Sequence, residues 1–268
     1  MALVHAGNAD IYYEEHGAGH PLLLLAGLAS DSQCWLGVIP QLAEHYRVIA
    51  MDNRTVGRTR GSGEGLSIEQ MADDALAVLS HLGIAQAHVV GHSMGGFIAL
   101  QMAAAHPKRV SGLLLAACAL RLGQRNHLMF DDMAARLQTD GYTERWFREL
   151  YYWIFSPQFF LNKAMLSASL QMSLEYPYPQ SVAGFGQQME AAAGFDAEPL
   201  CARVQAPTMV LGGELDIIFP PAQCAALAGA IPHAQHKTIP GAAHALFTEQ
   251  PAAFVHELVC FFATQEDA

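Results

Sequence analysis

The stretch that decides the fold is Ala87-His-Val-Val-Gly-His-Ser-Met-Gly-Gly-Phe-Ile-Ala-Leu-Gln-Met102. Its short apolar start predicts a buried strand at 87–91, and the pattern of residues 94–106 predicts a helix that stops before a proline. Between them lies a G-x-S-x-G pattern, whose glycines allow a strained strand-to-helix turn that exposes the serine. The pattern predicts that Ser93 is a nucleophile at a helix N-terminus, where the dipole favours negative charge. A structural glycine turn is the alternative.

Strands and helices alternate along most of the chain. The pattern predicts strands at 21–26, 47–52, 87–91, 110–118, 207–211 and 235–239, and helices at 33–45, 67–82, 94–106 and 221–230. Short continuous apolar strands separated by helices indicate a parallel sheet covered on both faces. Residues 3–16 predict an antiparallel hairpin at the sheet edge. We therefore predict an α/β fold with a mostly parallel eight-stranded sheet flanked by helices.

The alternation breaks between residues 121 and 200, where no convincing strand occurs. This stretch of 80 positions holds 14 of the 24 aromatic residues. It predicts an inserted helical cap, or lid, over one end of a core domain formed by residues 1–120 and 201–268. The aromatic side chains fill the core of the cap or face a substrate pocket. As substrate contacts we predict Trp153, Phe155 and Phe219.

Composition excludes several classes of protein. Of 268 residues, 52% are apolar and 15% are charged, and the net charge of −11 argues against nucleic acid or an anionic membrane surface as partners. No basic stretch followed by an apolar run opens the chain, and no apolar run approaches the roughly 20 residues of a membrane-spanning helix. The five cysteines (Cys34, Cys118, Cys201, Cys224 and Cys260) contain no CxxC pair. They predict reduced, mostly buried thiols in a cytoplasmic protein without a metal or cofactor.

A serine hydroxyl needs a base to remove its proton as it attacks. Among 13 histidines, His244 is the best candidate, because it lies in a loop between the strand at 235–239 and the final helix. That loop opens at the same end of the sheet as Ser93. His92 adjoins the nucleophile, but neighbours on a tight turn point in different directions.

The histidine in turn needs a carboxylate that orients it and balances its charge. Asp216 is the candidate, since it follows the strand at 207–211, and Glu214 is the nearest alternative. The strand at 110–118 is followed by no acid in a corresponding place. The chain order is therefore Ser93, Asp216, His244, as in serine hydrolases built on a parallel sheet.

Attack by Ser93 creates an oxyanion that requires hydrogen-bond donors. One donor is the backbone N–H of Met94, directly after the nucleophile. The second is expected in Ala26-Gly-Leu-Ala-Ser30, after the strand at 21–26, and we choose the backbone N–H of Leu28. A plain turn into the helix at Gln33 is the alternative for this segment.

These residues resemble the α/β-hydrolase superfamily, in the branch of small bacterial esterases, enol-lactonases and related carbonyl hydrolases. The resemblance covers nearly the whole chain. It depends on the serine turn, Gly212-Gly-Glu-Leu-Asp216, Gly241-Ala-Ala-His244 and Asp52-Asn-Arg-Thr-Val-Gly-Arg-Thr59. A serine at the turn argues against the haloalkane dehalogenases and epoxide hydrolases of the superfamily, which use aspartate there.

The chain departs from the family pattern at two places. In D-x-R-G-x-G-x-S, Thr55 replaces the glycine and Thr59 replaces the serine, a change in a structural segment. The usual His-Gly of the oxyanion segment is Ala26-Gly27 here. The expected donor of Leu28 is a backbone group and is retained. The glycine-rich H-G-G-G-P-G form, frequent in carbon–carbon bond hydrolases of the superfamily, is absent.

The expected function is a serine hydrolase that cleaves a carboxylic ester or lactone with an apolar portion through an acyl-enzyme. An alternative is a catabolic hydrolase of an enol-lactone, β-keto or vinylogous acid, including C–C or amide-type cleavage, in which His244 activates water. Acyl transfer or perhydrolysis uses the same groups. A non-catalytic ligand-binding module is a third hypothesis, against which a full triad argues. Arg121 and Arg125 at the edge of the cap are candidates for a carboxylate clamp. The sequence leaves the choice between monomer and homodimer open.

Overall fold

The chain is described by a computed structural model that covers residues 2–266. Its strands form one sheet in the order β1-β2-β4-β3-β6-β7-β8-β9, with β5 paired to β2. The strands are β1 Ala2–Ala6, β2 Ala9–His16, β3 His20–Leu25, β4 Tyr46–Met51, β5 Arg60–Gly61, β6 Ala87–His92, β7 Val110–Ala116, β8 Thr208–Gly213 and β9 Gln235–Ile239. Neighbours from β4 to β9 are parallel, and the pairs that involve β1, β2 and β5 are antiparallel. The mostly parallel sheet and the N-terminal edge hairpin are thus confirmed.

The sheet has nine strands where the sequence predicts eight. The additional strand is β5, whose two residues pair with Ala9 and Asp10. β2 is eight residues long, and β4 pairs only with its second half, Tyr13–His16. The first half of β2 is therefore free to accept β5, and a strand of two residues has no periodicity that the sequence could reveal.

Two layers of helices cover the sheet. The helices and 3₁₀ turns are η1 Ser32–Trp35, α1 Ile39–Leu42, α2 Ile68–His81, α3 Met94–Ala105, η2 Pro107–Arg109, α4 Gln124–Asp140, α5 Glu144–Ile154, α6 Pro157–Leu161, α7 Lys163–Leu174, α8 Val182–Ala193, α9 Glu198–Cys201, α10 Pro221–Ala230, α11 Leu246–Glu249 and α12 Pro251–Glu266. Leu23 and Leu25 belong to the buried cluster that includes side chains of α2, α3 and α10, whereas Leu22 and Leu24 belong to the cluster that includes side chains of η1, α1 and α12. Because successive side chains of a strand point to opposite faces, burial of both faces explains the uninterrupted leucine run.

The helix expected at 33–45 is broken into η1 and α1. Gly37 separates the two pieces, and Pro40 lies in the first turn of α1, where its missing N–H costs no helical hydrogen bond. The other expected helices of the sheet layers form within one or two residues of their predicted bounds. For example, Ser67 accepts a hydrogen bond from the amide of Gln70 at 3.2 Å and so caps α2.

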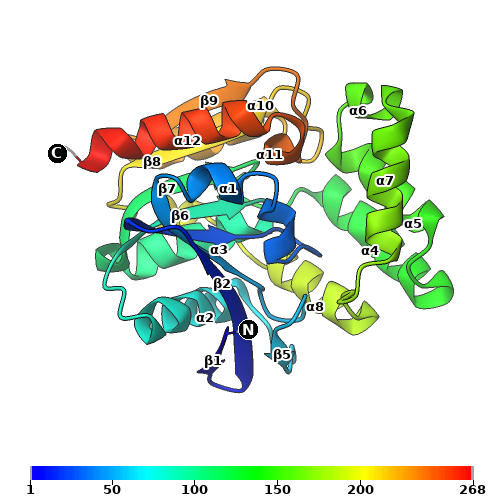
Figure 1. Cartoon of the computed structure of the whole chain (residues 1–268), viewed down its shortest axis with the longest axis horizontal. Coiled ribbons are helices and arrows are strands. Elements are labelled where there is room, and N and C mark those ends of the chain that lie inside the picture. The colour runs from blue at the N-terminus through cyan, green and yellow to red at the C-terminus, as the bar shows by residue number, and fades with distance from the viewer. Residues whose placement is uncertain (1, 267–268) are drawn as a thin grey trace.

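The segment between β7 and β8, residues 121–200, is called the cap segment below. It carries α4 to α8 and the first part of α9, and Figure 1 shows α4 to α7 gathered beside one end of the sheet. An isolated β-bridge joins Arg121 and Asp196 where the segment leaves and rejoins the sheet. The division into a core and a cap domain stays a prediction, and residues 1, 267 and 268 of its ranges lie outside the described residues.

Two further observations concern membrane-spanning helices and the cysteines. Within residues 2–266, no helix is long and apolar enough to cross a membrane. All five cysteines carry free thiols, and those of Cys118, Cys201 and Cys224 are buried.

Candidate active site

Ser93 occupies a strained turn between β6 and α3. Its backbone has φ 54° and ψ −119°, a conformation that residues with a side chain rarely adopt. The Ser93 amide donates to the carbonyl of Ala116 at 2.9 Å, and the Gly96 amide donates to the carbonyl of Ser93 at 2.8 Å. A Cβ atom on Gly91 would lie 2.1 Å from the carbonyl oxygen of Gly95. The glycine therefore permits the close approach of strand and helix that the turn requires.

His244 and Asp216 form a buried hydrogen-bonded pair. Nδ1 of His244 lies 2.9 Å from Oδ2 of Asp216, and the two residues are 4% and 2% exposed. The other carboxyl oxygen of Asp216 accepts hydrogen bonds from the amides of Ile218 at 2.8 Å and Phe219 at 3.0 Å. Because a carboxylate only accepts, Nδ1 of His244 carries the proton and Nε2 is left as the basic atom.

Glu214, the alternative acid, has a different partner. Its Oε2 accepts from the amide of Gly241 at 2.8 Å, so it holds the beginning of the loop that carries His244. The carboxyl group that reaches the imidazole is that of Asp216.

His92 supports the same loop from β6. Burial lowers the pKa of His92 to about 3, and the neighbouring His244 adds to this effect. The ring is therefore neutral, and its Nε2 donates to the backbone carbonyl of His244 at 3.0 Å. Trp35 and Phe247 contact His92 edge-on. His92 is thus placed to fix the main chain at His244 rather than to act as a base.

Ser93 and His244 line one cavity of about 340 Å³, called the first chamber. Its wall includes apolar side chains from the cap segment and α11, among them Phe130, Leu150, Ile154, Phe155 and Phe247. Within residues 2–266, no hydrogen bond joins Ser93 to His244. Catalytic hydrogen bonds are often long without a bound substrate.

The predicted oxyanion donors lie beside Ser93. Met94 is the first residue of α3, so its amide has no partner within the helix. Leu28 lines the first chamber, in the segment of residues 26–30 that we call the oxyanion loop. A Cβ atom on Gly27 would lie 3.2 Å from Cβ of Ser93, which shows how closely the loop packs on Ser93.

Of the three predicted substrate contacts, only Phe155 lines the first chamber. Trp153 faces a separate hollow on the outer side of α5, where the guanidinium of Arg125 lies 5.6 Å from its ring centroid. Phe219 is 1% exposed and packs between Phe97 and His244. Neither position supports the prediction of substrate contact. Trp153 does not share the side of α5 from which Leu150 and Ile154 line the first chamber, and Phe219 contacts Asp216 through its backbone N–H.

The two arginines considered as a carboxylate clamp have other partners. Arg121 is exposed and pairs with Asp196 and Glu198. Arg125 donates to the carbonyl of Ile217. Within residues 2–266, no group of three His, Cys, Asp or Glu side chains is arranged to hold a metal ion.

A second chamber of about 360 Å³ adjoins the first. The two share wall residues, including Ala29, Cys34, Leu150 and Met172. The wall of the second chamber includes five aromatic residues, Tyr142, Trp146, Phe147, Tyr176 and Tyr178. The concentration of aromatic residues in the cap segment indicated a pocket, but the division into two chambers depends on side-chain directions that the sequence does not reveal.

Comparison with known proteins agrees with this architecture. The family described as alpha/beta hydrolase fold matches residues 20–251, so the chain belongs to the α/β-hydrolase family. A protein of Azorhizobium caulinodans provisionally named carbamate hydrolase RutD is 31% identical over 97% of this chain and 98% of its own.

Two solved structures show the same fold. A thermophilic esterase from Thermogutta terrifontis has a TM-score of 0.87 at 26% identity and covers 98% of both chains. An enol-lactonase from Burkholderia xenovorans LB400 has a TM-score of 0.88 at 24% identity over 97% of this chain and 99% of its own.

Proposed function

We propose that this protein is a serine hydrolase that cleaves a carboxylic ester or lactone with an apolar portion through an acyl-enzyme. The observation that carries the proposal is the combination of the bonded pair His244–Asp216 with Ser93 on a strained turn, both open to one apolar chamber. The family and the esterase-like fold support it.

In the proposed reaction, Oγ of Ser93 attacks the carbonyl carbon while Nε2 of His244 takes the hydroxyl proton. The amides of Leu28 and Met94 donate to the resulting oxyanion. His244 then gives its proton to the leaving alcohol oxygen, the C–O bond breaks and the acyl group stays on Ser93. A water molecule then attacks the acyl carbon with the same proton transfers through His244, so the acid is released and Ser93 regains its proton. Asp216 keeps its negative charge throughout and stabilises the imidazolium.

The direct test compares hydrolysis of p-nitrophenyl esters by the wild-type protein and by Ser93→Ala. We expect kcat to fall by at least about 10³-fold, because the remaining groups bind substrate without a nucleophile. Ser80→Ala is the matched control, since Ser80 lies on α2 and bonds to the carbonyl of Leu76 far from the chamber. Turnover that survives Ser93→Ala contradicts the proposal.

A second candidate function is carbamate hydrolysis, favoured by the relative named for that activity. The same attack on the carbonyl carbon applies: the C–O bond breaks, the alcohol leaves and the carbamoyl group stays on Ser93. Water then releases a carbamic acid, which decomposes to an amine or ammonia and CO₂. The kcat/KM ratio for p-nitrophenyl carbamates and matched esters separates the two candidates. Mass spectrometry of the protein during turnover tests the covalent step, because an acyl or carbamoyl adduct on Ser93 is absent if His244 instead activates water.

A further inference from the structure

The oxyanion loop has one amide held by the cap segment. The N–H of Ala29 donates to Oε1 of Gln188, on α8, at 3.1 Å, and the N–H of Ser30 donates to the carbonyl of Gly27 at 3.3 Å. Within residues 2–266, the N–H of Leu28 forms no hydrogen bond. The Leu28 N–H is therefore free to bind a substrate oxygen, whereas the N–H groups of Ala29 and Ser30 already have hydrogen-bond partners.

The conformation of Ala29 requires such a restraint. Its φ of 59° lies in the left-handed region that residues with a side chain rarely adopt. The hydrogen bond that Ala29 donates to Gln188 fixes the peptide plane between Leu28 and Ala29, next to the plane that carries the Leu28 N–H. The direction of the predicted donor thus depends on Gln188.

Gln188 is itself fully buried and held at its other end. Nε2 of Gln188 donates to the carbonyl of Arg54 at 2.8 Å, and the side chain is 0% exposed. The guanidinium of Arg54 is anchored in turn by Asp74, at 2.5 and 2.8 Å, and by the carbonyl of Ala6 at 3.0 Å. A carbonyl at one end and an amide at the other fix the orientation of the Gln188 amide, because a flip would break both bonds.

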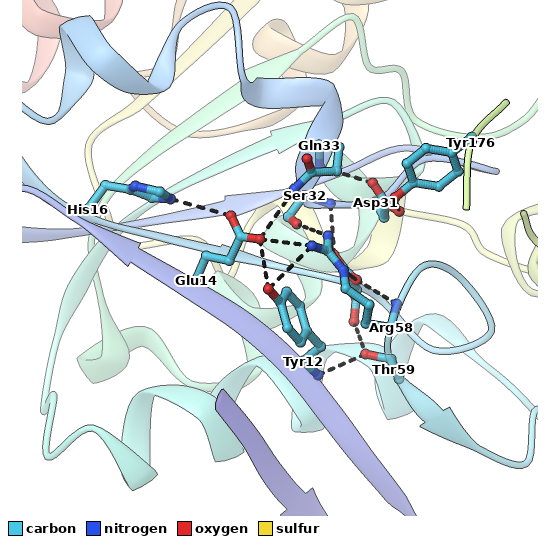
Figure 2. A network of polar contacts seen from close by, with 10 residues as sticks. Tyr12, Glu14, His16, Asp31, Ser32, Gln33, Arg58, Thr59 and Tyr176 are labelled. Carbon is cyan, nitrogen blue, oxygen red and sulfur yellow. Dashed lines mark hydrogen bonds and ion pairs between the residues drawn. The ribbon is translucent and has the colours of Figure 1, made fainter. Parts of the chain in front are cut away.

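The ends of the loop are held by contacts other than Gln188. Nδ2 of Asn53 donates to the carbonyl of Ala26 at 2.9 Å. Beyond the loop, Figure 2 shows Asp31 and Ser32 beside Arg58, which donates to Oγ of Ser32 at 2.9 Å, while Tyr176 donates to the carboxylate of Asp31. Anchored ends leave the middle of the loop, at Leu28 and Ala29, as the part that Gln188 must fix.

We propose that Gln188 is a positioning residue that aims the Leu28 N–H at the oxyanion. The inference rests on the proposed function and adds a role for a cap residue that need not touch substrate. Because the oxyanion develops only in the transition state, loss of this alignment lowers kcat and leaves KM nearly unchanged.

Two substitutions test the role. Gln188→Met keeps the volume and removes both hydrogen bonds, and we expect kcat to fall about 10- to 100-fold with KM changed less than about twofold. A boronic acid that forms a tetrahedral adduct with Ser93 is expected to lose affinity by a similar factor. Gln188→Glu is isosteric, and its protonated form can restore both bonds, since the carbonyl accepts from Ala29 and the hydroxyl donates to Arg54. The ratio of its kcat to that of the wild type therefore falls as pH rises, whereas the Gln188→Met ratio does not change with pH.

Gln187→Met is the matched control. Gln187 is the neighbouring glutamine on α8, is half-buried and lines neither chamber. Its kcat is expected to stay within about twofold of the wild type. Turnover that survives Ser93→Ala overturns both the proposed function and this inference. Full dependence on Ser93, with equal kcat values for the Gln188→Met and Gln187→Met variants, overturns the role of Gln188 alone. If Gln188→Met does not fold, a pH-independent ratio for Gln188→Glu overturns it.

Discussion

Gly95 shows how strictly the turn at Ser93 constrains single residues. A Cβ atom there would lie 2.1 Å from the carbonyl oxygen of Leu25, a backbone atom of β3 that cannot move without disturbing the sheet. We expect Gly95→Ala to lower the free energy of unfolding by about 2 kcal/mol or more. Urea denaturation followed by circular dichroism measures this.

Gly229 provides the control for that substitution. It lies exposed in α10, with nothing within 4 Å of an added Cβ atom, so Gly229→Ala should raise the free energy of unfolding by about 0.5–1 kcal/mol. Equal stabilities for the Gly95→Ala variant and the wild type would refute the steric argument.

The two acids near His244 are expected to differ sharply in their effect on turnover. In Asp216→Asn, the amide can present N–H groups to Nδ1 of His244, which favours the wrong tautomer, and kcat should fall by about 10⁴-fold. In Glu214→Gln, the side-chain oxygen still accepts from the amide of Gly241, so kcat should stay within about tenfold of the wild type. Steady-state kinetics on one ester compares the two variants. The reverse order of effects would assign the acid to Glu214.

At the scale of elements, β6 carries two buried histidines and leads into the turn at Ser93. Burial lowers the pKa values of both His88 and His92 to about 3, from 6.5 in an unfolded chain. Between about pH 6.5 and pH 3, the unfolded chain therefore binds protons that the folded chain does not. As far as these two histidines are concerned, the free energy of unfolding should not change with pH above pH 6.5. At lower pH, it should decrease by about 1 kcal/mol per pH unit for each histidine.

Urea denaturation between pH 5 and pH 8 measures this dependence. His92→Gln retains an N–H that can donate to the carbonyl of His244 and removes one titrating group. Its dependence on pH below 6.5 should therefore be weaker than that of the wild type. An unchanged slope would show that His92 is protonated in the folded protein.

The elements that the sequence predicts are those with a strong pattern. Buried strands such as β3 and β6 are continuous apolar runs, and α2 and α3 carry long apolar faces with clear ends, so their positions agree closely with the structure. β5 is too short to have a pattern, and Gly37 and Pro40 interrupt a helical period without abolishing it. The pattern of α5 identifies a helix but not its orientation, so it does not reveal that Trp153 lies outside the first chamber.

The same distinction, between residues that belong to a sequence pattern and residues that do not, applies to the site. The predicted roles of Ser93, Asp216 and His244 depend on motifs at strand ends, and the geometry of the described residues agrees with them. Gln188 belongs to no motif. Its importance arises from contact with Ala29, 159 residues away along the chain, and a single sequence contains no trace of such a contact.

At the scale of the whole molecule, the two adjoining chambers predict a preference for substrates longer than an acetate ester. Phe147, from α5, lines the second chamber and stacks on Tyr142 with ring centroids 5.3 Å apart. In Phe147→Ala, we expect kcat/KM for an aryl or long-chain acyl ester to fall about tenfold, because apolar contact area is lost, and kcat/KM for the acetate to stay within about twofold.

Phe160→Ala is the control for this substitution. Phe160 lies on α6 against Tyr152, outside the walls of both chambers, and its removal should leave the chain-length preference unchanged. Equal losses for the short and long esters in the Phe147→Ala variant would contradict a role for the second chamber in chain-length selection.

Ser93, Asp216 and His244 follow β6, β8 and β9, whereas the aromatic walls of the chambers, Phe247 excepted, come from residues 121–200. Grafting the corresponding piece of a relative into this scaffold is therefore a route to a chimaera with new selectivity. Because Gln188 lies within residues 121–200, such a graft replaces it as well. A grafted sequence without a side-chain amide at the position of Gln188 should give a chimaera that binds its new substrate well but turns it over slowly. Restoring glutamine at that position should restore the turnover rate.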